Sequence, residues 1–216
     1  MTTPITDRTF AAVLFDNDGT LIDSTQAVRR SWVAWAIEHD VDPFGLQGFH
    51  GLPAAAIVAT ILPDGDQTAA LARIVEIEES DTEGVVALPG AADALEALGG
   101  RGAIATSATR NLAVARLEAA GVGIPDVLVT ADDVTRGKPD PEPYVLAAQR
   151  VGADPAQCLV VEDAPSGLTA GRAAGCATLG VVSTHQAHDL DADLVVADLS
   201  HVEFVVGTDG VRLRLR

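Results

Sequence analysis

The residues best suited to chemistry follow the first apolar run of the chain. The run Phe10–Asp16 is almost continuously apolar up to its last residue, as in a buried strand, and Asn-Asp-Gly-Thr occupies positions 17–20. In an open parallel sheet ligands bind beyond the carboxyl ends of the strands, where Asp16 and Asp18 would lie. Such carboxylates can supply a nucleophile, an acid–base group or cation ligands. An EF-hand loop is excluded because its twelfth position, counted from Asp16, is Ala27.

Two further apolar runs end in polar residues that suit phosphate and metal. Asp-x-Asp-Gly alone is also common in solvated turns, so these other runs are needed to decide its meaning. One run ends in Thr106 and Ser107, whose hydroxyl groups can donate to a phosphate oxygen. Another ends in Glu162 and Asp163, a second carboxylate pair suited to a hard divalent cation.

Lys138 is the only lysine of the chain, beside 13 arginines. A compact ammonium fits next to a carboxylate and a phosphate, a site that a planar guanidinium fits differently. A surface lysine retained by chance is the alternative, but it leaves the polar ends of three runs unexplained. Together these residues indicate one site for a phosphate group and a cation.

A parallel sheet with helices on both faces would bring these residues together. Short β-branched runs alternate with Ala-rich stretches of helical period, which is typical of βαβ units and predicts a doubly wound α/β core. The expected strands are Phe10–Asp16, Gly102–Thr106, Val127–Thr130, Cys158–Glu162, Ala177–Val182 and Leu194–Val196, and the expected helices are Ala91–Leu98, Asn111–Ala120, Glu142–Val151 and Ser166–Ala174.

The segment from about Leu21 to Val86 interrupts this alternation directly after the first strand. It shows no convincing strand but three helical patterns, at Thr25–Glu38, Ala54–Ile61 and Gln67–Glu79. We therefore expect a small inserted helical cap over 21–86, an α/β core over 1–20 and 87–200, and a C-terminal hairpin or tail over 201–216.

Four motifs in order and spacing resemble those of the haloacid dehalogenase (HAD)-like hydrolase superfamily. Asp16-Asn17-Asp18-Gly19-Thr20 is similar to the first motif, Thr106 or Ser107 to the second, Lys138 to the third and Glu162-Asp163 to the fourth. The resemblance covers nearly the whole chain, since the helical insertion corresponds to the small cap of subclass I. Leu21-Ile22-Asp23-Ser24 and the residues at 161–167 are similar to the branch that contains sugar-phosphate phosphatases, glycerol-phosphate phosphatases and β-phosphoglucomutase.

The resemblance implies a Rossmann-like core and a Mg²⁺-dependent phosphatase that works through an aspartyl-phosphate. Asp16 would attack phosphorus, and Asp18 would protonate the leaving alcohol and then deprotonate the hydrolytic water. The implied Mg²⁺ ligands are Asp16, the Asp18 backbone carbonyl and Asp163, with Glu162 close by or acting through water. The implied phosphate-binding groups are Thr106, Lys138, the backbone around Asn17, Ser107 and Ala108, and the side chain of Arg110.

The substrate stays open at this level. The cap contains no lysine for a phosphonate hydrolase or for β-phosphoglucomutase, and the histidine and arginine places of the mutase fall on Val28 and near Ala54. A mutase is therefore the less favoured alternative. His50-Gly51 is similar to the His-Gly of sugar-phosphate phosphatases, although the arginine that usually follows is missing. A purely structural role of His50 in its loop is an equal alternative. The scarcity of cations in the cap favours a neutral polyol or monosaccharide as leaving group.

A receiver domain, which signals through a phosphoaspartate, is the alternative from a different class. Receiver domains also combine clustered aspartates, a Thr or Ser and a Lys on a doubly wound sheet. They are much shorter, however, and they lack both the helical insertion and an Asp-x-Asp-Gly-Thr motif.

The composition excludes other classes of partner. The 216 residues suit one domain with an insertion, and a formal net charge of −17 leaves no basic footprint for nucleic acid or anionic membranes. Cys158 and Cys176 lie in apolar runs and predict no disulfide. The N-terminus shows no signal-peptide pattern, and no apolar run reaches the roughly 20 residues of a membrane span. We expect a cytoplasmic monomer whose partner is a small phosphorylated sugar or polyol.

Overall fold

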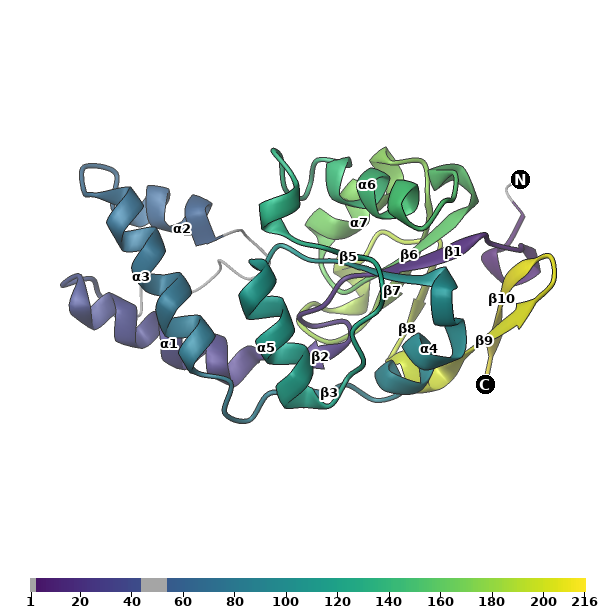
Figure 1. Cartoon of the computed structure of the whole chain (residues 1–216), viewed down its shortest axis with the longest axis horizontal. Coiled ribbons are helices and arrows are strands. Elements are labelled where there is room, and N and C mark those ends of the chain that lie inside the picture. The colour runs from purple at the N-terminus through teal and green to yellow at the C-terminus, as the bar shows by residue number, and fades with distance from the viewer. Residues whose placement is uncertain (1–2, 44–53) are drawn as a thin grey trace.

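A six-stranded parallel sheet forms the centre of the protein (Figure 1). The computed structural model describes residues 3–43 and 54–216. The strand order is β5-β4-β1-β6-β7-β8, and every neighbouring pair is parallel. The strands are β1 (Ala12–Phe15), β4 (Gly102–Ala105), β5 (Leu128–Val129), β6 (Cys158–Glu162), β7 (Ala177–Val181) and β8 (Leu194–Val196).

The order of the strands fixes where a ligand can bind. From β1 the chain continues to β4 on one side, whereas from β6 it continues to β7 on the other side. The connections therefore diverge between β1 and β6, and the crevice of a doubly wound sheet lies at the carboxyl ends of two such strands.

Helices cover both faces of the sheet, which confirms the predicted doubly wound α/β core. All four residues of β1 are buried; Val13 and Phe15 contribute to one hydrophobic cluster, and Ala12 and Leu14 to the cluster on the opposite face. Residues of α4 and α5 belong to the first cluster and residues of α6 and α7 to the second. These helices are α4 (Ala91–Leu98), α5 (Arg110–Ala120), α6 (Glu142–Arg150) and α7 (Pro165–Ala173).

The ends of α5 follow from local chemistry. Thr109 precedes the helix, and its hydroxyl accepts a hydrogen bond from the Leu112 N–H, satisfying one of the otherwise free donors of the first turn. Gly121 follows the helix with φ 67°, a conformation that glycine adopts without steric penalty. The loop after β4 therefore turns directly into α5.

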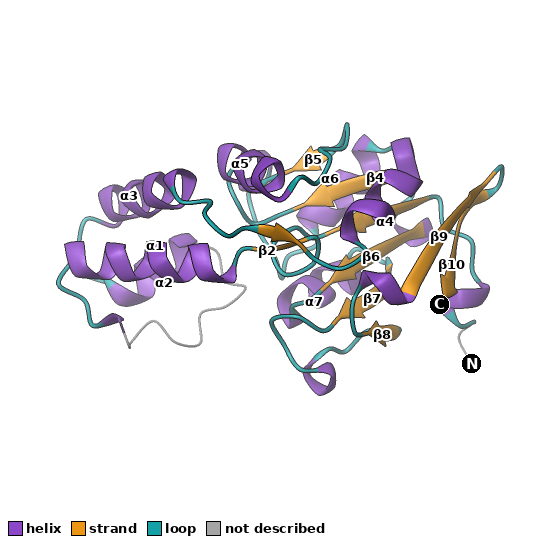
Figure 2. Cartoon of the chain, turned by 90° about the horizontal axis from the view of Figure 1, so that it is seen from below, coloured by secondary structure: helices purple, strands orange, loops and turns teal. Residues whose placement is uncertain are grey.

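Three helices between the first and second strands of the sheet pack on a hydrophobic cluster of their own (Figure 2). They are α1 (Thr25–Glu38), α2 (Ala54–Ile61) and α3 (Gln67–Ser80). Trp32 and Trp35 of α1 lie in this cluster with Ile74 of α3, and the indole N–H of Trp35 donates to the Ala70 carbonyl at 2.8 Å. Figures 1 and 2 show this layer beside one end of the sheet.

Two short antiparallel strands join this layer to the sheet. Ile22 and Asp23 form β2 and pair with Val86 and Ala87 of β3. The expectation that no strand lies between Leu21 and Val86 was therefore wrong at both ends of that segment. Strands of two residues are too short to show alternating hydrophobicity, so the pattern of the sequence could not reveal them.

The C-terminal residues form the expected hairpin. β9 (Val202–Gly207) and β10 (Gly210–Leu215) pair antiparallel. Buried apolar residues of both strands belong to the same hydrophobic cluster as Phe15 of β1. The rings of Phe204 and Phe15 meet edge to face with centroids 5.9 Å apart.

Short 3₁₀ turns complete the described chain at Ile5–Asp7, Gly99–Arg101, Ala131–Asp133, Pro155–Gln157, Ala187–Asp189 and Leu199–His201. Within the described residues, no helix is long and apolar enough to cross a bilayer.

The two cysteines give a direct test of this packing. Cys158 and Cys176 are free and buried, and burial raises the pKa of Cys158 to about 11 and that of Cys176 to about 12. Because the thiolate is the reactive form, we expect iodoacetamide at pH 8 to modify both residues only after denaturation in urea. Mass spectrometry that found rapid modification of the folded protein would contradict the fold around β6 and β7.

Candidate active site

The polar ends of β1, β4 and β6 converge at one edge of the sheet. The N–H of Asp16, directly after β1, donates to the Val161 carbonyl of β6 at 2.9 Å, which fixes Asp16 beside the end of β6. Asp16, Glu162 and Asp163 are buried, and carboxylate oxygens of the three lie within 4.8 Å of one another. The sequence predicted these residues at strand ends of one parallel sheet, and the parallel pairing of β1 with β6 brings them together.

Lys138 enters this cluster from the loop between β5 and α6. Its ammonium lies 2.5 Å from Oδ1 of Asp16 and 2.7 Å from Oε1 of Glu162. It also lies 5.0 Å from the ring centroid of Tyr144. Burial alone would lower the pKa of Lys138, but Asp16 and Glu162 raise it above its usual value, so the side chain stays charged.

Glu162 is occupied by donors on both oxygens. Oε1 accepts from Lys138 and from the Tyr144 hydroxyl at 2.8 Å, and Oε2 accepts from the N–H groups of Asp163 at 3.0 Å and Ala164 at 3.1 Å. A side chain at Gly167 would overlap the Glu162 carboxylate, so only glycine fits there. Burial raises the pKa of Tyr144 well above its usual value, and Glu162 adds to that shift, which keeps the phenol a donor. Glu162 therefore holds Lys138 in place.

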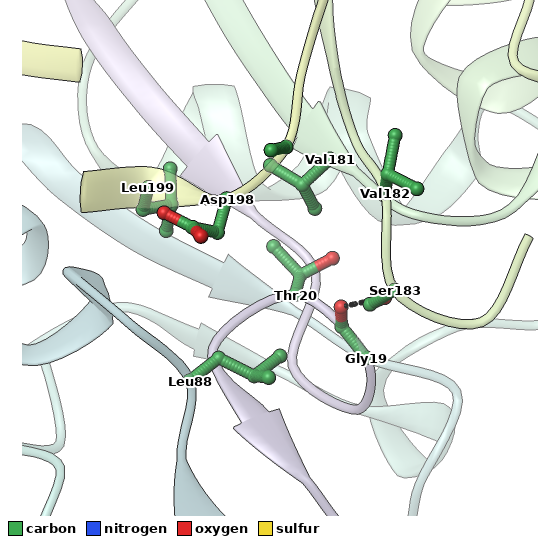
Figure 3. Close-up of a pocket in the computed structure, with 9 residues that line it drawn as sticks. Gly19, Thr20, Leu88, Val181, Val182, Ser183, Asp198 and Leu199 are labelled. Atoms are coloured by element: carbon green, nitrogen blue, oxygen red, sulfur yellow. Dashed lines mark hydrogen bonds between the residues drawn. The ribbon is translucent and has the colours of Figure 1, made fainter. Parts of the chain in front are cut away.

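Asp163 is held by hydroxyl groups from two loops. Thr20 donates to Oδ1 at 3.3 Å, and Ser183 at 3.3 Å and Thr184 donate to Oδ2. Ser183 also contacts the Gly19 carbonyl, as Figure 3 shows at the small cavity beside Thr20. Gly19 has φ 91°, and a side chain there would overlap the Asp163 carboxylate. Ser183 and Thr184, in the loop after β7, were not found from the sequence because that loop carries no motif.

The charges of the cluster fit a divalent cation. Three carboxylates and one ammonium leave a formal charge of −2 in a buried place. Burial and the neighbouring Glu162 raise the pKa of Asp163 to about 7. Burial also raises the pKa of Asp16, against the opposing effect of Lys138. Hard oxygen donors with unbalanced negative charge are what Mg²⁺ prefers, so these residues suit such an ion.

Hydrogen-bond donors without acceptors lie around Asp16. Thr106, directly after β4, is buried; its hydroxyl accepts from the Ala108 N–H at 3.1 Å and, within the described chain, donates to no residue. The N–H groups of Asn17, Asp18 and Ser107 likewise have no protein acceptor among the residues described. Such groups can bind an oxyanion.

Asp18 contacts three donors. Oδ1 accepts from the Ser24 hydroxyl at 2.6 Å and from Nη1 of Arg116 at 2.9 Å, and Oδ2 accepts from the Asn17 amide at 3.2 Å. Nη2 of Arg116 donates to Glu78 of α3 at 3.1 Å.

Arg116 and Glu78 were not identified from the sequence. Their signal is a charged residue on the buried face of a helix, since Leu112, Ala113, Arg116 and Leu117 are buried on α5, and Ala70, Ile74 and Glu78 on α3.

The guanidinium of Arg110 is held by β5 and the turn that follows it. It donates to the Leu128 carbonyl and to Asp133, both at 3.0 Å, and Asp133 also pairs with Arg150. A role of Arg110 in phosphate binding therefore stays a prediction. His50 and Gly51 lie outside the described residues.

Comparison with known proteins agrees with this geometry. The model of the haloacid dehalogenase-like hydrolase family matches residues 10–175, and the chain belongs to this family. It is 42% identical over 197 residues to hexitol phosphatase A of Escherichia coli (strain K12), covering 88% of this chain and 91% of that protein. It is 35% identical over 206 residues to validoxylamine A 7'-phosphate phosphatase of Streptomyces hygroscopicus subsp. limoneus, covering 90% and 97%.

Solved structures show the same architecture. The crystal structure of a hydrolase from Pseudomonas syringae is similar with a TM-score of 0.78 at 28% identity, covering 88% of this chain and 94% of that chain. The resemblance seen in the four motifs is thereby confirmed, and the protein is an enzyme of the HAD type.

The surplus of negative charge predicts a stabilising cation. Mg²⁺ at 100 times its Kd would stabilise the folded protein by about 2.7 kcal/mol, so we expect the melting temperature to be several degrees higher in Mg²⁺ than in EDTA. Asp163→Asn should lose this difference. It should also melt no lower than the wild type in EDTA, because the substitution relieves repulsion among the carboxylates. Equal Mg²⁺ effects on both proteins, or none on the wild type, would contradict a metal site here.

Proposed function

We propose that the protein is a Mg²⁺-dependent phosphatase that hydrolyses a small sugar or polyol phosphate through an aspartyl-phosphate on Asp16. The observation that carries the proposal is the buried contact of Lys138 with Asp16 beside two further carboxylates. The proposal extends to the division of the chain, with residues 21–86 acting as a cap over the core, and to the cytoplasm as its location.

Asp16 is the nucleophile of this proposal. Lys138 occupies Oδ1, and no donor among the described residues lies on Oδ2, so one oxygen is oriented while the other is free. Attack on phosphorus forms the Asp16 acyl phosphate and breaks the bond to the substrate oxygen. In this proposal Lys138, the Thr106 hydroxyl and the free N–H groups at 17, 18 and 107 would hold the phosphoryl oxygens.

Asp18 is the acid and base. Its carboxylic acid form gives a proton to the departing alkoxide, and the resulting carboxylate takes a proton from the water that attacks the acyl phosphate. One group thus serves both half-reactions, and the proton balance closes after each turnover.

The cation would be held by Asp16, Asp163 and the Asp18 backbone carbonyl. When bound, Mg²⁺ supplies positive charge that offsets the approach of an anionic phosphate to an anionic carboxylate. Glu162 is too fully hydrogen-bonded to be a direct ligand, so it supports the site through Lys138.

The substrate class follows from the relatives and from the insertion. Hexitol phosphatase A and the 2-deoxyglucose-6-phosphate phosphatases of Saccharomyces cerevisiae carry sugar or polyol substrates in their names. Among the described residues of α1–α3, Arg30 and Arg73 pair with carboxylates, and Arg29 is the one arginine without such a pairing. A neutral leaving group is consistent with such an insertion.

The proposal is tested by phosphate release from a panel of hexitol, sugar and glycerol monophosphates in Mg²⁺ and in EDTA. We expect Mg²⁺-dependent turnover that Asp16→Asn lowers by a factor on the order of 10⁴ or more, as loss of a covalent nucleophile does in other enzymes. Asp209→Asn, an exposed carboxylate in the hairpin turn, is the matched control and should keep full activity.

Three other outcomes would contradict the proposal. Turnover in EDTA would exclude a requirement for the metal. Turnover by Asp16→Asn would exclude Asp16 as the nucleophile. No turnover with any alkyl phosphate, together with an adduct from acetyl phosphate that persists for minutes, would favour a signalling role.

A further inference from the structure

Arg116 is a buried cation that the proposed chemistry does not use. It lies on α5 with 4% of its surface exposed, and its guanidinium bridges Asp18 of the first motif and Glu78 of α3. Glu78 is 7% exposed. Figures 1 and 2 show α3 beside α5, and the two helices are in contact.

Stability does not explain this arrangement. A buried ion pair is often no better than well-packed apolar side chains of similar volume, because the charges lose their hydration. Here one guanidinium serves two carboxylates, and its Nε is buried without a partner among the described residues. Burial raises the pKa of Glu78, which reflects the same energetic cost. The charges are therefore better explained by what Arg116 does to Asp18.

Both ends of the inserted segment are linked to Asp18, one directly and one through Arg116. Ser24, just before α1, donates to Oδ1, and Glu78, near the end of α3, contacts the same oxygen through Arg116. Two donors on Oδ1 fix the rotation of the carboxylate. Oδ2, which has only the longer contact to Asn17, is left as the oxygen that can carry a proton.

We propose that Arg116, oriented by Glu78, is the positioning residue of Asp18 and directs Oδ2 of Asp18 towards the leaving-group oxygen. This inference rests on the proposed phosphatase function. It makes proton transfer depend on the docking of α3 against α5, because Glu78 is the residue of α3 that, among those described, forms a hydrogen bond and ion pair with Arg116.

The test compares two leaving groups. Departure of a hexitol requires a proton from Asp18, whereas p-nitrophenolate leaves as an anion without one. The value of kcat/KM covers the steps up to release of the leaving group, so it isolates the acid role. Variants to compare are Arg116→Met, Arg116→Lys, Glu78→Gln and the double variant Glu78→Gln/Arg116→Met, with melting temperatures measured for each.

Glu79→Gln is the matched control. Glu79 accepts from Thr109 across the same contact between α3 and α5 but touches neither Arg116 nor Asp18. It should keep wild-type kcat/KM with both substrates.

For Arg116→Met we expect kcat/KM for the hexitol phosphate to fall by about 10²-fold, the lower end of what a positioned acid contributes, with less than about a threefold change for p-nitrophenyl phosphate. Arg116→Lys should be intermediate because an ammonium keeps the charge but cannot span both carboxylates. Glu78→Gln should show a smaller selective loss. If Arg116→Met fails to fold, the double variant tests the same loss without leaving the Glu78 carboxylate unpaired. The kcat/KM values of Glu78→Gln with the two substrates test the inference independently.

Equal losses with both substrates, no loss, or the same effect from Glu79→Gln would overturn the inference and leave the phosphatase intact. Failure of the proposed function is a different result, since the wild type would then hydrolyse no alkyl phosphate.

Discussion

The ammonium of Lys138 lies between Asp16 and Glu162, at 2.5 and 2.7 Å, and the rest of the site is arranged around these two contacts. They require that the ends of β1 and β6 be neighbours, which the parallel register provides by pairing Phe15 with Val161. They also require that the buried Glu162 carboxylate be held in place, and four donors on its two oxygens serve this purpose. A cation that is paired on two sides can remain buried without losing its charge.

The same pairing leaves negative charge in excess, and that excess explains the remaining features. Asp163 is held by hydroxyl groups rather than by a second ammonium, so its charge is oriented without being neutralised. In the proposed function a dication would complete the balance, so that an approaching phosphate would meet a neutral site. The overall charge of −17 makes this local neutralisation important, because the protein as a whole repels anions.

The second constraint is the position of Asp18 between two layers. Asp16 is held by β6 and Lys138, whereas Asp18 contacts Ser24 just before α1 and is linked to α3 through Arg116. In the proposed mechanism, the nucleophile would therefore be fixed by the core and the proton-transfer group by the residues from Ser24 to Glu78. If the proposal holds, Ser24 and Glu78 influence proton transfer without touching the phosphate.

Much of this could be predicted because it depends on local pattern. α1 and α4 begin and end where the periodicity indicated, and Asp16, Thr106 and Glu162 were expected together because parallel strands end at one edge. Contacts between layers were not predictable. Arg116 and Glu78 are 38 positions apart on different helices, and only the structure pairs them. Tyr144 was missed for the same reason, since nothing in the sequence of α6 shows that its hydroxyl reaches β6. Arg110 follows the second motif closely, yet its guanidinium pairs with Asp133, which sequence spacing alone could not show.

The central claim is that Asp16 forms a covalent bond to phosphorus, and a chemical trap tests it most directly. Asp18→Asn should slow hydrolysis of the acyl phosphate, while p-nitrophenyl phosphate still allows it to form. Borohydride reduces an acyl phosphate to an alcohol, so a quench during turnover in Mg²⁺ should convert residue 16 to homoserine, as seen by peptide mass spectrometry. Turnover with Asp16 recovered unchanged, or reduction at a different carboxylate, would contradict the account.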